Sequence, residues 1–585
     1  MGKINTCVKL HETRQISTKR ALFIFIATTL VLILTLVIDN RDSSGSSFSI
    51  HQISSSTTKT TTIPRRPEAT GRLIRSQPFY YGVDGPRDPR FYNIIPEEEA
   101  LTFPPCKDIN QAASTQYSKV SLADHSKDTY AIGETIRAVV TLFNGYGKRK
   151  YSGGDQIRAT IESNMFLASA PCVITDNRDG THAVFCEALW SGDSKINVSL
   201  AYTREVITRL YDRKLKTLPK NLIYGTYMKG NYTEDTPCHP IRKNLLILTS
   251  YTEICDLTSQ NSGMPFFCGR PSNENLLCED LQVLNLDRLG SNSVKGSLTD
   301  CERKLFQSAH HTLEPSLSIY VANRIEEKYV SVIDKPSIPC SQYNVSLTWH
   351  SRRPTGFFYG GKWNLRNCLG TSQQRLMSCL RNRRLYLIGD STVRQWFTAV
   401  LDRFKCKMAN EDFWKCPKCQ KKVQCTNKDI NFETVWYQHG QPNRMKTGWY
   451  TKNTWYSTSY HIDKIPREER AIVLIHIYLH VHGYHSDVFK QRMQIIRKSV
   501  ENYLSQSKHS IVLIKAPHTH FDVPLGDFSG YVFSKILFDV FDGLHDKVVL
   551  LNNRDATQAQ HEVPIHPRKN IVNAMVDQMM SYVCN

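Results

Sequence analysis

The stretch Leu385-Tyr-Leu-Ile-Gly-Asp-Ser-Thr-Val-Arg-Gln-Trp396 predicts a buried strand that runs directly into a helix. Its first four residues are apolar, and an apolar stripe at helical spacing follows Ser391. Gly389-Asp390-Ser391 therefore lies at the turn, which puts a serine hydroxyl beside a helix N-terminus. Backbone N–H groups there have no partner within the helix and can stabilise an oxyanion. The pattern favours an acyl-handling enzyme, and the alternative is an ordinary helix N-cap.

The chain around this stretch alternates predicted strands and helices. The predicted strands are Leu385–Ile388, Ala471–Ile475, Ser510–Ile514 and Lys547–Leu551. Apolar stripes predict helices over 393–404, 489–504, 531–541 and 571–583. Such alternation predicts a parallel sheet covered by helices on both faces, with its chemistry beyond the carboxyl ends of the strands. The polar residues that follow strands at this edge are Ser391, His480, His518 and His566.

Composition and charge exclude several classes of function. The chain has 585 residues and a formal net charge of +20, but its basic residues are scattered. No zinc-finger, homeodomain or RNA-binding signature accompanies them, so we expect no nucleic-acid partner and interpret the charge as a preference for anionic surfaces such as acidic glycans. No phosphate-binding loop, dinucleotide-binding glycine pattern or HExxH motif occurs, so we expect neither a cofactor nor a catalytic metal.

The N-terminus has the pattern of a membrane anchor. Residues 21–38 form an uninterrupted apolar run of a length that spans a bilayer, behind a basic segment over residues 1–20. This predicts a cytoplasmic tail, a single transmembrane signal-anchor and a type II orientation. The alternative is a cleaved signal peptide, whose apolar core is shorter. The Ser- and Thr-rich residues 39–95 predict a disordered stem.

Cysteines and sequons agree with an oxidising compartment. Of the 17 cysteines, 16 follow the apolar run, an even number that suits disulfides. Three sequons predict glycosylation at Asn197, Asn231 and Asn344. Together these features predict the lumen of the secretory pathway, in the Golgi, with the cell surface or secretion as alternatives.

From about residue 120 to residue 209, apolar and polar residues alternate in short runs that predict strands. Glycine-containing turns separate these runs, a pattern typical of a β-sandwich. Cys172 and Cys186 flank a hairpin turn at Asp179, where a cross-strand disulfide is plausible. Residues 226–350 hold six cysteines with weak periodicity and predict a disulfide-linked connecting region.

Another four cysteines lie close together in the C-terminal half. They are Cys406, Cys416, Cys419 and Cys425. Their spacing would suit zinc, whereas a lumenal location favours disulfides.

Two sets of motifs carry a resemblance to a known family. The C-terminal set is Gly356-Phe-Phe-Tyr-Gly-Gly-Lys-Trp363, the block Cys379–Trp396, Ile565-His-Pro567 and Ser581-Tyr-Val-Cys584. The upstream set is Tyr130-Ala-Ile-Gly-Glu134, Ser152-Gly-Gly-Asp155, Asp179-Gly-Thr181 and Leu189-Trp-Ser-Gly192. Together they resemble the neurexophilin and PC-esterase domain (NXPE) family over roughly residues 95–585. The resemblance implies a neurexophilin-like, immunoglobulin- or filamin-type domain at 96–225 and a PC-esterase domain at 351–585.

The PC-esterase domain is similar to SGNH/GDSL acyl-esterases, and this similarity implies roles for individual residues. Ser391 would be the nucleophile and His566 the base, and the Ser391 N–H together with His480 would serve the oxyanion. The acidic partner of His566 is open, because Asn552 stands where relatives have an aspartate. Asp555 is the preferred substitute and Glu562 the alternative. A second departure is Tyr478, which stands where relatives tend to have a small residue. For His480, a purely structural role is an equal alternative to a role at the oxyanion.

Two functions remain open at this point. The first is a membrane-anchored acyl transferase or esterase, most simply for acetyl groups, that takes an acyl donor and a glycan or glycoprotein acceptor through acyl-Ser391. The second is a non-catalytic neurexophilin-like binding protein with a decayed esterase site. The predicted fold class is an immunoglobulin-like β-sandwich followed by an SGNH-like α/β domain, behind one N-terminal transmembrane helix. The oligomeric state is not predicted.

Overall fold

The computed structural model describes residues 94–584 with internal gaps. The gaps are 217–220, 262, 289–298, 308–310, 326–327, 330–331, 352, 409–421, 440–449, 452–455, 521–523 and 563. The described residues belong to one compact unit. The predicted tail, the predicted transmembrane segment 21–38 and nearly all of the predicted stem lie outside the described residues.

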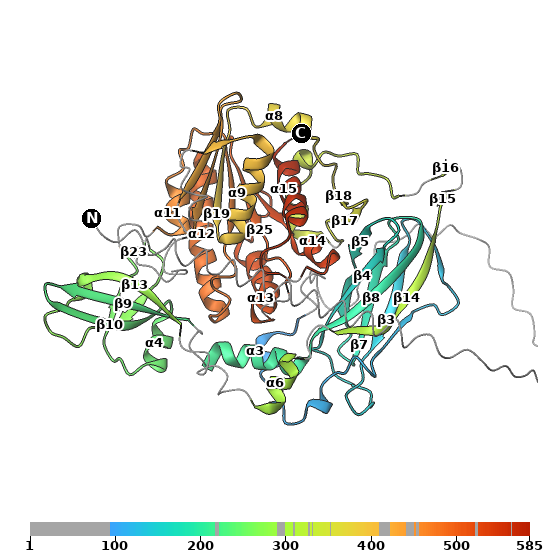
Figure 1. The fold of residues 1–585 in the computed structure, drawn as a ribbon, viewed down its shortest axis with the longest axis horizontal. Helices are drawn as coiled ribbons and strands as arrows, with labels where there is room; N and C mark the ends of the chain where they lie inside the picture. The colour runs from blue at the N-terminus through green and yellow to red at the C-terminus, as the bar shows by residue number, and fades with distance from the viewer. Residues whose placement is uncertain are drawn as a thin grey trace, which may run out of the picture. The chain divides into compact units, whose positions relative to one another are not determined.

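The C-terminal sheet, which contains β19 and β25 (Figure 1), has seven strands in the order β20-β21-β22-β19-β24-β25-β26. Their bounds are β19 (Arg384–Gly389), β20 (Lys407–Met408), β21 (Val423–Asn427), β22 (Phe432–Gln438), β24 (Ala471–His476), β25 (Ile511–Lys515) and β26 (Val548–Leu551). The five strands from β22 to β26 are parallel, and β21 and β20 extend the sheet antiparallel. In chain order the parallel strands run 2-1-3-4-5, so the direction of winding reverses between β19 and β24. Ligands of such sheets bind at this switch point.

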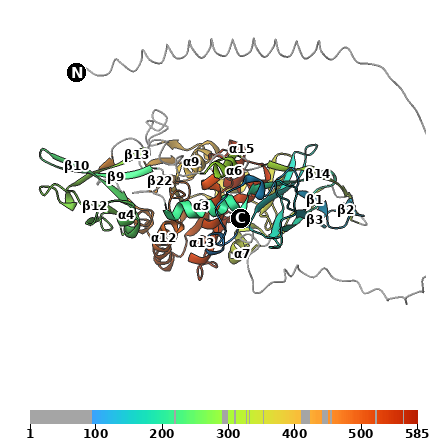
Figure 2. The ribbon, with the colours of Figure 1, turned by 90° about the horizontal axis from the view of Figure 1, so that it is seen from below.

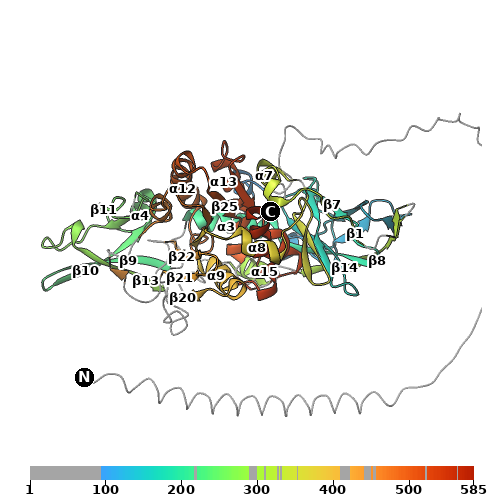
Figure 3. The ribbon, with the colours of Figure 1, turned by 90° about the horizontal axis from the view of Figure 1, so that it is seen from above.

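Helices cover both faces of this sheet, as the alternation of strands and helices predicts. On one face lie α9 (Ser391–Phe404) and α15 (Lys569–Val583), and on the other lie α12 (Ser486–Gln506) and α13 (Pro524–Val540). Figures 2 and 3 show the three layers from opposite sides. Alternate strand residues supply the two cores: Leu387 and Leu474 pack against α9 and α15, whereas Ile388 and Ile475 pack against α12 and α13.

The β-sandwich is built from two sheets. One has the order β1 (Lys119–Leu122), β3 (Thr135–Thr141), β7 (Thr181–Glu187), β6 (Val173–Asp176). The other has the order β18 (Lys362–Leu365), β17 (Gly356–Tyr359), β5 (Ala168–Pro171), β4 (Gln156–Ser163), β8 (Gly192–Tyr202), β14 (His311–Ala322), β2 (Thr129–Ala131). Cys172 and Cys186 are joined by a disulfide with an S–S distance of 2.02 Å. Strands β14, β17 and β18 come from beyond residue 225, so distant parts of the chain complete the sandwich.

A third, six-stranded sheet has its own small core. Its order is β11 (Ile254–Asp256), β12 (Phe267–Gly269), β10 (Tyr232–His239), β9 (Asn221–Lys229), β13 (Leu281–Arg288), β23 (Tyr450–Thr451). All of its strand pairs are antiparallel, and two disulfides join Cys238 to Cys268 and Cys255 to Cys278. The weak periodicity of this region had suggested only a connector.

The predicted fold class of two folded domains is therefore wrong. The fold is mixed α/β with several sheets, because the supposed connector forms a sheet of its own and lends β14 to the sandwich. The single N-terminal transmembrane helix is not supported either. Across the described residues, no helix combines the length and the apolar character needed to cross a membrane.

A buried ion pair joins the sandwich to the α/β domain. Arg158 of β4 bonds to the carboxylate of Asp527 in α13 and donates to the Tyr531 hydroxyl at 3.0 Å. The Tyr202 hydroxyl at the end of β8 also donates to Asp527, at 2.8 Å. Arg158 is 3% exposed and Asp527 is fully buried. The Arg554 Nη1 lies 3.7 Å from Asp527, so two guanidinium groups balance the buried carboxylate.

Candidate active site

Ser391 lies where β19 passes into α9, at the switch point of the parallel sheet. Asp390 caps the helix, and its carboxylate accepts from the Thr392 N–H at 2.9 Å. Gly389 permits close approach to the neighbouring strand, since a Cβ there would lie 2.6 Å from the carbonyl oxygen of His476. These local features place the serine hydroxyl at the carboxyl edge of the sheet.

The structure brings Ser391 and His566 together. The Ser391 Oγ lies 2.8 Å from the His566 Nε2, a distance at which the imidazole can take the hydroxyl proton. The backbone N–H of Ser391 makes no hydrogen bond to any residue in the described ranges, so it is free for an oxyanion. Ser391 itself is only 6% exposed, whereas His566 is exposed.

The loop that carries His566, between α14 (Arg554–Ala559) and α15, is held at three points. The fully buried Glu562 accepts from the N–H and the Nε of Arg568, at 2.9 and 2.8 Å. The Gln395 amide of α9 donates to the carbonyl of Pro567 at 2.9 Å. The His518 Nε2 lies 2.8 Å from the carbonyl of Ile565. The chain on both sides of His566 is therefore fixed relative to α9.

A buried basic cluster lies beneath the serine, at the ends of β24 and β25. The Lys515 Nζ lies 3.1 Å from the His476 Nε2 and 3.3 Å from the His518 Nδ1. Each imidazole donates its other N–H to a carbonyl: His476 Nδ1 to Lys515 at 2.8 Å, and His518 Nε2 to Ile565. Both rings can therefore be neutral acceptors for the lysine ammonium. The Asp390 carboxylate lies 3.7 Å from His476 and supplies the countercharge.

The pKa values follow from this burial. Burial lowers the pKa of His476 to about 3 and that of Lys515 to about 8. Burial by itself raises the pKa of Asp390, but the attraction of its basic neighbours, His476 first among them, outweighs burial and holds that pKa well below its ordinary value. Near pH 7 the cluster thus contains one carboxylate, one ammonium and neutral imidazoles.

The C-terminal part of the chain also matches a known domain. Residues 363–584 match the family model described as the NXPE family member 4-like C-terminal domain. This range contains Ser391, His566 and the whole buried cluster. This part of the chain is therefore similar to the C-terminal domain of NXPE family members.

Both candidate acids of this domain form hydrogen bonds to residues other than His566. The Asp555 carboxylate accepts from the N–H and the hydroxyl of Thr355, at 2.7 and 3.0 Å, and from the Asn552 amide at 3.1 Å. Glu562 is engaged by Arg568 as described above. The aspartate role therefore stays a prediction, and Asp555 has a clear alternative role in holding Thr355, next to β17, against the end of β26.

His480 lies near the acid of the Gly-Asp-Ser turn. The N–H of Leu479 donates to the Asp390 carboxylate at 3.4 Å, and the His480 ring bonds to that of His439. His439 in turn donates its backbone N–H to the carbonyl of Gly389 at 3.2 Å. His480 is thus attached to the rim of the serine turn, and its oxyanion role stays a prediction. Tyr478 is fully buried, with its hydroxyl 3.3 Å from the His520 Nε2.

The remaining predicted sites lie apart from this cluster. Asn231 is exposed in the β9–β10 turn and Asn344 is exposed before α7 (Ser346–His350), whereas Asn197 is half-buried in β8 and its amide bonds to Glu162. Cys406 and Cys425 carry free thiols, and Cys416 and Cys419 lie outside the described residues. In the part of the chain that the structure describes, no cluster of three or more acidic, histidine or cysteine side chains could hold a metal ion.

Sequence reasoning missed His476 and Lys515. Both end strands that are otherwise apolar, Ala471–His476 and Ile511–Lys515. A polar residue at the carboxyl end of a buried parallel strand was the available signal, because that edge carries the chemistry of such sheets.

Proposed function

We propose that the chain is an acyl transferase or esterase, most simply for acetyl groups, that acts on glycan hydroxyls through an acyl-serine. The single observation that carries the proposal is the 2.8 Å approach of the Ser391 Oγ to the His566 Nε2 at the switch point of the sheet. A serine hydroxyl becomes nucleophilic only when a neighbouring base takes its proton. The match of residues 363–584 to the C-terminal domain of NXPE family members supports a PC-esterase-like or related activity.

The reaction has two balanced steps. Ser391 Oγ attacks the acyl carbonyl while His566 Nε2 takes its proton, and the donor leaves with that proton as the acyl-serine forms. An acceptor hydroxyl then gives its proton to His566 and attacks the ester, which frees Ser391. The unpaired Ser391 N–H stabilises the oxyanion in both steps. Water and a sugar hydroxyl are equivalent nucleophiles toward the acyl-serine, so hydrolysis and transfer share one site.

The second candidate is a neurexophilin-like binding protein with an inactive esterase site. One observation favours it: Thr355, Asn552 and Arg568 also bond to the carboxylates of Asp555 and Glu562, the two candidate acids. Competition for these carboxylates would weaken the stabilisation of the imidazolium and so reduce activity.

We propose that the protein resides in the secretory pathway, because its disulfides suit an oxidising compartment. Six disulfides occur in the described residues, a density typical of lumenal and extracellular chains.

The test is capture of the acyl-enzyme. The full-length protein is mixed with p-nitrophenyl acetate, quenched in acid and digested, and the acetyl group is located by peptide mass spectrometry. We expect an acetyl ester on Ser391 in the wild type and none in His566→Ala. A folded wild type that hydrolyses no ester and carries no acetyl group would favour the binding protein.

A further inference from the structure

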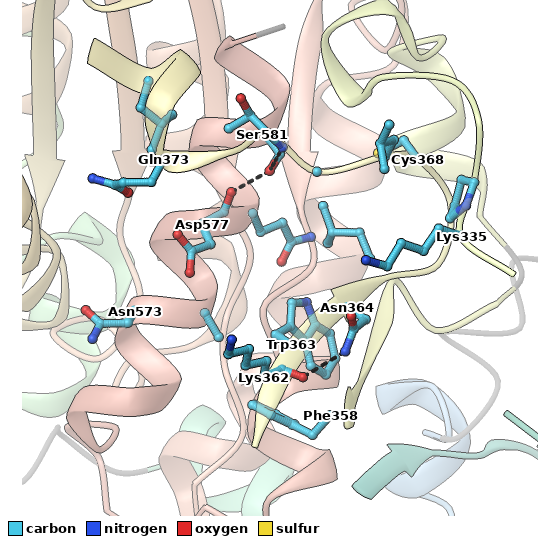
Figure 4. A pocket seen from close by; sticks show the side chains of 18 of the residues that line it. Lys335, Phe358, Lys362, Trp363, Asn364, Cys368, Gln373, Asn573, Asp577 and Ser581 are labelled. Carbon is cyan, nitrogen blue, oxygen red and sulfur yellow. Dashed lines mark hydrogen bonds between the residues drawn. The ribbon is translucent and has the colours of Figure 1, made fainter. Parts of the chain in front are cut away.

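A polar pocket separate from the serine lies along α15. It is bounded by β17, β18, α8 (Gln373–Cys379) and α15, and its volume of about 520 Å³ falls in the range of small-molecule sites. Figure 4 shows Phe358 and Trp363 at one end, Ser581 at the other, and Lys335 extending inward from its loop. Nothing in the proposed acyl chemistry uses these residues.

Two buried polar groups in the pocket lack hydrogen-bond partners. Gln578 of α15 is 1% exposed, and neither its amide nitrogen nor its amide oxygen is bonded to any described residue. The indole N–H of Trp363 is likewise buried and unbonded among the described residues. Buried polar groups are nearly always satisfied in folded proteins, so these three atoms have bonding capacity that a ligand in the pocket can use. An amide offers both donors and an acceptor, which matches hydroxyl groups.

The pocket also carries unbalanced positive charge. Lys335 and Lys362 line it, both are exposed, and neither forms an ion pair within the described ranges. Its one carboxylate, Asp577, is neutralised by Arg403 at 2.5 Å. The side chains of the lining that carry a charge without an ion-pair partner are therefore the two lysines, and their positive charge favours an anionic ligand.

We propose that this pocket binds an acidic sugar. At the aromatic end the half-buried Trp363 offers an apolar ring, backed by the buried Phe358 ring at a centroid distance of 4.9 Å and an interplanar angle of 59°. The Gln578 amide can bond to hydroxyl groups of the sugar. The two lysines meet a single carboxylate at the rim. The proposal concerns binding and does not require an acyl-serine.

The position of the pocket connects it to the proposed acyl chemistry. Asn570, which lines the pocket, follows His566 by four residues. From Asn570 to Ser581 the pocket extends for about 16 Å along α15, at the helical rise of about 1.5 Å per residue. A glycan held there would have its next unit close to the loop of His566, which makes the pocket a subsite for the acceptor.

The test measures binding in the absence of turnover. Full-length Ser391→Ala protein is titrated with D-glucuronate and with D-glucose, and saturation-transfer NMR reports contact with each sugar. We expect glucuronate to bind and glucose to bind about tenfold more weakly. This result is independent of the proposed acyl transfer, because Ser391→Ala abolishes that chemistry whether or not the pocket is occupied. No saturation transfer to either sugar, or equal affinity for both, overturns the proposal.

Three variants locate the binding. Gln578→Met should weaken glucuronate at least tenfold while keeping or raising the melting temperature, because it removes an unsatisfied buried amide. Lys362→Gln, at an exposed position, should weaken glucuronate and leave glucose unchanged. Gln506→Met, at the exposed end of α12, is the matched control and should change neither. Unchanged binding in both Gln578→Met and Lys362→Gln overturns the assignment to this pocket.

Discussion

The imidazole Nε2 of His518 lies 2.8 Å from the carbonyl oxygen of Ile565, one residue before His566. His518 is fully buried beyond the end of β25, so a rigid part of the sheet holds the loop that presents the base to Ser391. Lys515 fixes the proton arrangement, because its ammonium donates to the His518 Nδ1 and leaves the Nε2 proton for the carbonyl. His518 is thus a positioning residue rather than a catalytic one.

Replacing His518 by phenylalanine should slow acylation of Ser391 by about 100-fold, since a displacement of about 1 Å has that effect on an oriented reaction. The rate of labelling by a fluorophosphonate measures it. The matched control is His545→Phe, which also removes a buried histidine bonded to a carbonyl, that of Phe538 at 3.0 Å, but away from the serine. Equal losses in the two variants would show a general effect of destabilisation.

Stability should fall as the pH falls below about 6.5. The folded pKa of His476 is lowered to about 3 by burial, so in this range the unfolded state binds a proton that the folded state does not. At about 1.36 kcal/mol per pH unit, this histidine alone should cost about 2 kcal/mol at pH 5. Urea unfolding between pH 5 and 8 measures the slope. His476→Gln should flatten it, and an unchanged slope would contradict the assignment.

The buried pair Arg158–Asp527 should be needed for the sandwich and the α/β domain to unfold together. Arg158→Met or Asp527→Asn alone should each cost roughly 3–5 kcal/mol, because each leaves a charge or its hydrogen bonds uncompensated in the interior. The double variant should cost clearly less than the sum. Denaturant unfolding of the four proteins gives the coupling energy, and strict additivity would show that the two side chains do not interact.

The disulfide Cys379–Cys584 should contribute more stability than Cys172–Cys186. The two bonds join residues 205 and 14 positions apart, and in the chain-entropy model the longer loop gains more. Removing Cys379–Cys584 with paired serines should cost roughly 5 kcal/mol, against about 3 kcal/mol for the shorter loop. The first bond also secures the end of α15, so its loss should slow Ser391 labelling. A larger effect from the shorter loop would contradict the prediction.

Local patterns predicted much of the α/β domain. The strands β19, β24, β25 and β26 lie within one residue of their predicted ends, because each is a short apolar run between polar turns. The strand β22 (Phe432–Gln438) was missed, since Glu433 and Thr434 interrupt its apolar pattern.

What the sequence did not reveal depends on contacts between distant residues. Strand β14 joins the sandwich by pairing Val321 with Gly192, and no local signal specifies such a partner. The commitment of Asp555 to Thr355 is likewise a tertiary contact across 200 residues. Ser391 was found because its turn is local, whereas the role of His566 as the base came only from a family resemblance.

The most direct test of the proposed function is intact-protein mass spectrometry after treatment with a fluorophosphonate. The full-length wild type is compared with Ser391→Ala, His566→Ala and Ser486→Ala, the last being a control serine that also begins a long helix. The proposal predicts one adduct on the wild type and on Ser486→Ala, and none on the other two. An unlabelled but folded wild type, or equal labelling of Ser391→Ala, would contradict it.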